Sequence, residues 1–318
     1  MRYRVEASTI GRKCEEVLER GERYSRVRHV FANTLYLQVG RDMVIVNRKN
    51  NRSPNTITIP QDSLNIPFYS YIRIGDNVEI GRQYIRVGEL EIGLENAEGY
   101  FPEKIDRIRE LDELCERMYL KGLKTILLLY YISTENIPIL GLSRFKEFLN
   151  KVVYPFSKGD LEAIKKTENY KMLLGLGQGF TPSGDDYLLG FISFLNLLDD
   201  RFQIPRVILE DEILFSNTNW VSAMFLKYAQ NGLYDEDVYQ LLSSISLKNE
   251  TSFMDSILHL ARRGHTSGLD ITLGVLTGFA SVIDRVKSRN LTERLINCTL
   301  GSFLGEHVEN IYPGCQRS

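Results

Sequence analysis

The sequence contains little of what marks several large classes of protein. Its four cysteines lie far apart and form no CxxC pair, which argues against a disulfide framework and against a cysteine zinc cluster. An excess of positive charge is also missing, because 39 basic and 41 acidic side chains give a formal net charge of −2. A nucleic-acid partner normally requires a broad basic face. We therefore expect a cytoplasmic protein with no nucleic-acid partner.

Long apolar runs are absent as well. The longest nearly apolar stretch, 187–198, has twelve residues. That length suits a buried helix and falls short of the ~20 residues needed to span a bilayer. The N-terminal residues carry charges throughout, unlike a secretory signal. We therefore expect no membrane association.

Strand signals fill the first hundred residues. Short β-branched runs alternate apolar and polar side chains and are separated by Gly, Asn, Asp and Pro, as in a sheet with one wet face. The pattern predicts an antiparallel sheet or small barrel, with strands at 27–31, 34–39, 43–46, 56–59, 71–74, 78–80 and 84–87. It breaks near Gly99 and Pro102, and helical spacing follows. We predict an α+β fold with a β-rich region over 1–100 and a mainly helical region over 101–318.

A glycine-rich segment, 175–186, runs into the apolar stretch described above. Thr181 suits an N-cap and Pro182 the first helical position, so a helix is predicted to begin there. The alternating glycines, among them Gly177 and Gly179, permit close backbone approach. The loop is therefore predicted to wrap a small polar group against the free N–H groups of the helix.

A second segment, 264–274, echoes the first at a constant offset of 84 residues. Both copies place Ser-Gly-x-Asp at the start of an apolar helix and a glycine one turn later, where a missing side chain lets two helices approach closely. A match of this length arises by chance about once in such a chain. The shared chemistry therefore supports the pairing more than the count of identities does.

Carboxylates at this position raise an electrostatic question. Asp185, Asp186 and Asp270 place negative charge at the helix starts, and two like charges a few ångströms apart repel by ~4 kcal/mol at an effective dielectric constant of about 20. Two solutions stay open for an anionic ligand. Either a Mg²⁺-like ion bound by Asp185 and Asp186 bridges to the ligand, or the carboxylates accept hydrogen bonds from the NH₂ group of an amide.

His265 is the candidate for proton transfer, because its ordinary pKa lies near neutrality and it precedes a predicted helix start. Simple capping is an alternative role for His265, and also for Thr181 and Ser183. An acidic residue such as Asp185 in a first helical turn is also ordinary complementation of the helix dipole.

The two segments 177–190 and 264–270, with Thr218-x-x-x-Ser222 between them, resemble the AllH family. The resemblance implies a subunit of an oxamate carbamoyltransferase, which converts oxalurate and phosphate to oxamate and carbamoyl phosphate in anaerobic allantoin breakdown. It further implies an FdrA-like subunit and a third subunit as partners. The chain lacks the Ser-Thr-Arg-Thr-Arg phosphate loop of ordinary carbamoyltransferases, so any transferase mechanism here would be a different one.

The predicted site binds a small anionic metabolite. Its candidate catalytic residues are His265, Asp186 and Asp270, and its candidate ligand-binding residues are Gly177, Gly179, Thr181, Ser183, Gly184, Asp185, Thr218, Ser222, Thr266, Ser267 and Gly268. Two other functions stay open: a non-catalytic metabolite-binding partner subunit, and a stand-alone metal-dependent enzyme that acts on an acyl phosphate.

Overall fold

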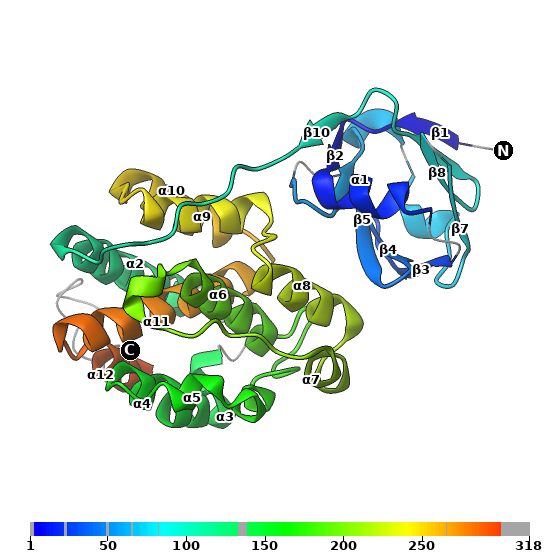
Figure 1. Ribbon diagram of the computed structural model, residues 1–318. Helices are drawn as coiled ribbons and strands as arrows, with labels where there is room; N and C mark the ends of the chain where they lie inside the picture. Colours follow the sequence, from blue (N-terminus) through cyan, green and yellow to red (C-terminus); the bar gives the residue numbers. More distant parts are fainter. Residues whose placement is uncertain are drawn as a thin grey trace, which may run out of the picture. The chain divides into compact units, whose positions relative to one another are not determined.

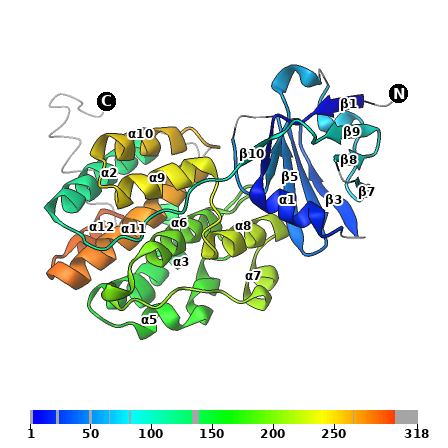
Figure 2. The same cartoon turned by 45° about the horizontal axis from the view of Figure 1, so that its top comes forward.

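The computed structural model describes residues 3–21, 24–48, 51–64, 66–81, 83–132, 139–264 and 266–299. They form two compact units (Figures 1 and 2). The first contains the described residues up to Lys104 together with Leu233–Tyr239, and the second contains the others. The division of the sequence into 1–100 and 101–318 stays a prediction.

The first unit consists mainly of two mixed sheets. A four-stranded sheet has the order β1-β9-β8-β7, and a six-stranded sheet has the order β10-β2-β6-β5-β4-β3. The pairs β1–β9, β2–β10 and β5–β6 are parallel, and the others are antiparallel. The strands are β1 (Tyr3–Glu6), β2 (Thr9–Gly11), β3 (Ser25–Val30), β4 (Thr34–Val39), β5 (Asp42–Asn47), β6 (Thr56–Thr58), β7 (Val78–Ile80), β8 (Tyr84–Val87), β9 (Leu90–Gly93) and β10 (Glu98–Tyr100).

These strands confirm the β-rich N-terminal region and correct its topology. The sheets are mixed rather than antiparallel, and neither closes into a barrel over the described strands. The predicted strand at 71–74 is wrong, because the chain turns there: Arg73 N–H donates to Asp76 Oδ2 at 2.8 Å, and Gly75 has a φ of 91°.

The core of the first unit follows the predicted alternation. β4 buries Leu35, Leu37 and Val39 and leaves the residues between them partly exposed. Helix α1 (Arg12–Glu19), which the sequence analysis did not predict, adds the buried side chains of Cys14 and Val17. The small apolar face of this charged helix is thus enough to attach it to the core.

The mainly helical C-terminal region is confirmed. Its helices are α2 (Glu113–Ile132), α3 (Ser143–Phe148), α4 (Tyr154–Ser157), α5 (Glu162–Lys165), α6 (Ser183–Leu197), α7 (Asp211–Asn217), α8 (Trp220–Gln230), α9 (Glu236–Ser246), α10 (Glu250–Leu260), α11 (Ser267–Lys287) and α12 (Leu291–Thr299). One π-helical turn, Leu149–Val153, joins α3 to α4. In the part of the chain that the structure describes, no helix has the length and apolarity to cross a membrane.

Helices α6 and α11 pack against each other at the centre of the second unit (Figure 1). Both are buried along most of their length, because α11 also packs on α2, α4, α10 and α12 and α6 packs on α8. Phe194 of α6 and Phe279 of α11 lie 5.2 Å apart between ring centroids, and Tyr119 of α2 meets the same Phe279 edge-on at 6.1 Å. This packing holds the N-terminal ends of α6 and α11 in fixed positions.

Candidate functional site

The glycine loop folds back onto the first turn of α6. Gly175, Gly177 and Gly179 have φ angles of 71°, 109° and 110°, which side-chain-bearing residues rarely adopt. The turn brings Leu176 C=O to the helix, where it accepts a hydrogen bond from Gly184 N–H at 2.8 Å. A Cβ atom on Gly184 would lie 2.0 Å from Leu173 O, so glycine is required there.

This geometry corrects the predicted helix start. Ser183 is the first helical residue, Pro182 precedes it, and no side chain caps the helix. Asp185 N–H donates to Pro182 C=O at 3.0 Å, and Gly184 N–H is bonded as described above. The backbone thus already uses donors that the sequence analysis assigned to a ligand, and Thr181 is free to bond elsewhere.

The second copy of the motif has a similar close approach. α11 begins at Ser267, again without a side-chain cap. A Cβ atom on Gly268 would lie 1.6 Å from Leu260 O, and Asp270 N–H donates to Thr266 C=O at 2.8 Å. His265 lies outside the described residues, so its role stays a prediction.

The two helices cross through reciprocal glycine contacts. A Cβ atom on Gly190 of α6 would lie 1.9 Å from Ile271 O of α11. A Cβ atom on Gly274 of α11 would lie 2.0 Å from Tyr187 O of α6. Since Ile271 and Gly274 stand 84 residues after Tyr187 and Gly190, each helix makes the same contact with the other. The crossing is therefore an approximate two-fold arrangement, and it contains the close helix approach that the sequence predicted.

Polar side chains at the starts of α6 and α11 also contact one another across the two helices. Thr181 Oγ1 donates to Asp186 Oδ2 at 3.0 Å and lies 3.2 Å from Ser267 Oγ of the other helix. Asp270 accepts a hydrogen bond from Tyr130 of α2, with 2.6 Å between Oη and Oδ1. The sequence-predicted residues Thr181, Asp186, Ser267 and Asp270 thus gather at the start of α6 and α11. We call the pair of side chains Asp186 and Asp270 the paired carboxyls.

Burial sets the protonation of the paired carboxyls. Asp186 is 6% exposed and Asp270 is 0% exposed. Burial raises the pKa of Asp186 well above its ordinary value; the hydroxyls of Ser267 and Thr181 and the charge of Arg263 oppose this increase, while the charge of Asp270 adds to it. Burial raises the pKa of Asp270 to about 6, and the hydroxyls of Tyr130, Ser183 and Thr266 oppose this increase. Burial therefore disfavours the negative charge on both carboxyls.

Asp185 faces a different set of partners. It accepts a hydrogen bond from Gly175 N–H at 2.9 Å and another from the hydroxyl of Thr218. Burial raises its pKa to about 6, and hydrogen bonds from Thr218, Gly175 and Ser222 oppose the increase. Asn219 caps α8 through Ser222 N–H and also donates to Phe180 C=O of the glycine loop at 3.0 Å. Asp185, Thr218 and Ser222 thus attach the loop to the start of α8.

The predicted metal pair is Asp185 and Asp186. Their hydrogen bonds run to different partners, Gly175 and Thr218 for Asp185 and Thr181 for Asp186. Over the described residues, no group of three or more His, Cys, Asp or Glu side chains is arranged to hold a metal ion. Mg²⁺ usually keeps several water ligands and can be bound by only two carboxylates, so this pair stays a prediction.

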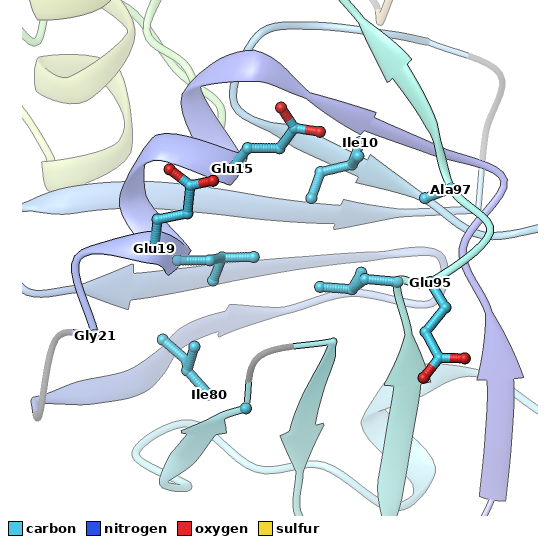
Figure 3. A pocket seen from close by; sticks show the side chains of 10 residues that line it. Ile10, Glu15, Glu19, Gly21, Ile80, Glu95 and Ala97 are labelled. Atoms are coloured by element: carbon cyan, nitrogen blue, oxygen red, sulfur yellow. The ribbon is translucent and has the colours of Figure 1, made fainter.

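A separate pocket lies in the first unit (Figure 3). It has a volume of about 580 Å³, with Glu15 and Glu19 of α1 and Glu95 around Ile10 and Ile80. Burial, followed by the charge of Glu19, raises the pKa of Glu15. None of the predicted site residues lines this pocket.

Comparison with known families covers both units. A model of the AllH family N-terminal domain matches residues 6–99, and a model described as oxamate carbamoyltransferase subunit AllH matches residues 173–279. The chain belongs to the AllH family. No solved structure matches it. The second AllH match contains the paired carboxyls, both glycine segments and the start of α8, so every predicted site residue falls within it.

One residue that bonds to the candidate site was missed in the sequence. Tyr130 lies 140 residues from Asp270, outside the matched range. It belongs to an apolar stretch of α2, and it is 4% exposed. A hydroxyl within a buried run was the available signal, but the sequence could not identify its partner.

Proposed function

We propose that this AllH-family chain is the metabolite-binding subunit of a carbamoyltransferase-type complex. The complex would convert oxalurate and phosphate to oxamate and carbamoyl phosphate in the cytoplasm, in anaerobic allantoin and purine nitrogen catabolism. An FdrA-like subunit and a further subunit would be its partners. The family membership supports the role of carbamoyltransferase subunit, and the pathway and the partners are part of the proposal.

One observation carries the assignment of the site. The matched range 173–279 brings together two buried carboxyls; burial raises the pKa of both, and the charge of Asp270 further raises that of Asp186. A neutral carboxyl donates a hydrogen bond and an ionised carboxylate accepts one. A carbamoyl group offers the complementary pair, a carbonyl acceptor beside NH₂ donors. We therefore propose that Asp186 donates to the ligand's carbonyl and that Asp270 accepts from its NH₂ group.

The anionic end of such a ligand also finds a place in this proposal. A neutral Asp186 removes most of the like-charge repulsion that the sequence suggested. Arg263 lies close enough to Asp186 for its charge to lower the pKa of that group. We propose that the carboxylate or phosphate of the ligand lies near Arg263. The residues Gly177, Gly179, Ser183, Thr266, Ser267 and Gly268 would surround the ligand, and His265 is kept as the proposed proton-transfer group.

The test is ligand binding by the purified chain, followed by activity of the assembled complex. Oxamate, oxalurate, carbamoyl phosphate and phosphate are each added with and without Mg²⁺ while thermal unfolding is monitored. A ligand at about 100 times its Kd stabilises the folded state by about 2.7 kcal/mol. Asp186→Asn and Asp270→Asn should abolish the shift. Asp284→Asn is the matched control, because Asp284 is also a buried carboxyl of α11 and its oxygens bond the backbone of Leu291 and Thr292.

The outcomes separate the three candidate functions. Production of carbamoyl phosphate only after an FdrA-like subunit is added supports the proposed role. Turnover by the chain alone would favour the stand-alone enzyme, particularly if it requires Mg²⁺. Activity of the complex that survives Asp186→Asn and Asp270→Asn would leave the chain a non-catalytic partner and would refute the assigned site.

A further inference from the structure

The two-fold arrangement of α6 and α11 extends to the hydroxyls around the paired carboxyls, since Ser267 and Thr181 lower the pKa of Asp186 and Ser183 and Thr266 lower that of Asp270, but one hydroxyl has no counterpart. Asp186 Oδ2 accepts a hydrogen bond from Thr181, which precedes its own helix. Asp270 Oδ1 accepts from a further hydroxyl, that of Tyr130, which lies on α2 and belongs to neither copy of the motif. Tyr130 is therefore a feature that distinguishes one half of the site from the other.

Asp270 Oδ2 has an unusual environment. Over the described residues, it is the one buried carboxylate oxygen without a hydrogen-bond partner. The whole side chain is 0% exposed. A buried acceptor that lacks a partner costs free energy, and folded proteins rarely retain one without a functional reason. A donor supplied by a ligand would satisfy this oxygen.

The position of α2 makes Tyr130 suited to orient this carboxyl. Tyr119 of the same helix is fully buried and contacts Phe279 of α11, so α2 is attached to α11 at a second point. The Tyr130 hydroxyl approaches Oδ1 to 2.6 Å. A short hydrogen bond to one oxygen restricts rotation of the carboxyl plane and thereby fixes the direction in which the other oxygen accepts.

We propose that Tyr130 is a positioning residue that holds Oδ1 of Asp270, so that Oδ2 accepts a hydrogen bond from an amide N–H group of the bound ligand. The class of ligand rests on the proposed function, whereas the roles of Tyr130 and Oδ2 rest on the contacts and burial described above.

Oxamate and oxalate provide the first test, because they differ mainly in whether one end carries NH₂ or a carboxylate oxygen. Their Kd values are measured by calorimetry for the wild-type chain, for Tyr130→Phe and for Tyr119→Phe. Tyr130→Phe should weaken oxamate binding by about tenfold or more, as expected for a hydrogen bond to a charged group, and should change oxalate binding by less than about twofold. Tyr119→Phe makes the same chemical change on the same helix and should alter neither.

The ratio of the two affinities separates positioning from support of the fold. A structural loss in Tyr130→Phe would weaken both ligands alike and leave the ratio unchanged, and that result would overturn the assignment of Tyr130. If the wild-type chain prefers oxalate over oxamate, Oδ2 is not an acceptor for an amide.

A second measurement does not depend on the physiological ligand or on a variant at Tyr130. In chain labelled with ¹³C at the aspartate carboxyls, the Asp270 resonance is identified by its absence from Asp270→Asn. Formamide, used as a minimal amide probe, should shift this resonance in a saturable way and should leave that of Asp284 in place. Absence of a shift would refute the role of Oδ2 even if the complex is active. A shift without any binding of oxamate would instead retain the inference and contradict the proposed ligand.

Discussion

The crossing of α6 and α11 makes a specific prediction for Gly190→Ala. A new Cβ atom would lie 1.9 Å from Ile271 O and 3.0 Å from Val275 N, both of which are backbone atoms of α11. Because non-bonded heavy atoms normally stay about 3.5 Å apart, the two helices would have to separate locally by about 1.5 Å. Side-chain rotation cannot relieve this clash.

The magnitude follows from two opposing terms. Alanine gains about 1 kcal/mol over glycine in helix propensity. Overpacking typically costs about 1 to 3 kcal/mol and occasionally more, and a clash with rigid backbone belongs at the upper end. We expect a net loss of about 2 kcal/mol, or a decrease in Tm of about 4 to 8 °C for a unit of this size. Gly274→Ala should lose as much, since its Cβ would lie 2.0 Å from Tyr187 O.

Urea and thermal unfolding, followed by circular dichroism, measure these losses. Gly278→Ala is the control on the same helix as Gly274, because its Cβ would first meet a side chain, the ring of Phe194 at 2.9 Å, and not a backbone atom of the other helix. We expect this control to change stability by less than about 1 kcal/mol. The double variant of Gly190 and Gly274 should lose less than the sum of the single losses, because one separation of the helices relieves both clashes. Losses no larger than that of Gly278→Ala, or strict additivity, would refute the reciprocal contact.

Three further predictions concern the buried carboxyls. The folded-state pKa of Asp270, about 6, exceeds the value of ~3.9 for an unfolded chain. The folded state therefore binds more protons between these two pH values. The free energy of unfolding of the wild-type chain, relative to that of Asp270→Asn, should fall by up to about 3 kcal/mol as pH rises from 4 to 6 and then level off. A rise over that range in urea titrations would contradict the burial of this group. Thr218→Val removes the hydroxyl that bonds Asp185 and should cost about 1 to 3 kcal/mol; it should also speed proteolysis within the glycine loop, and unchanged cleavage there would show that Asp185 does not attach the loop. Asp284→Ala removes the acceptor for Leu291 N–H and Thr292 N–H, both at 2.7 Å; it should lower Tm by about 4 to 8 °C, equivalent to about 2 kcal/mol, while any loss of oxamate binding would indicate that the two ends of α11 are coupled.

Regular patterns made part of the fold predictable. The alternation in 34–39 identified β4, and the apolar spacing identified the helical region and the central α6 and α11. The sequence did not indicate α1, because most of its residues are charged. Parallel pairing between β1 and β9, and between β2 and β10, joins segments distant in the chain, and local pattern contains no information about such partners.

The candidate site shows the same limit. The repeated Ser-Gly-x-Asp predicted two helix starts, and the glycines one turn later predicted their close approach, as observed. The prediction of Thr181 as the cap was wrong, because a neighbouring loop carbonyl bonds the helix instead. Asp185 and Asp186 are adjacent in sequence but point about 100° apart around a helix, so they bond to different partners. Tyr130 reaches the site through tertiary packing alone.

The reciprocal glycine contact has a consequence for how such a site can diversify. Each helix supplies the glycine that the other requires. A contact of this form is also made by two identical subunits across a two-fold axis, where it is called isologous. In a homodimer, every substitution would change both halves at once, and the two carboxyls would remain equivalent. Because one chain contains both helices, each half can vary independently. Tyr130 beside Asp270 and Arg263 beside Asp186 are two such differences, and they allow a nearly symmetric scaffold to distinguish the two ends of an asymmetric molecule.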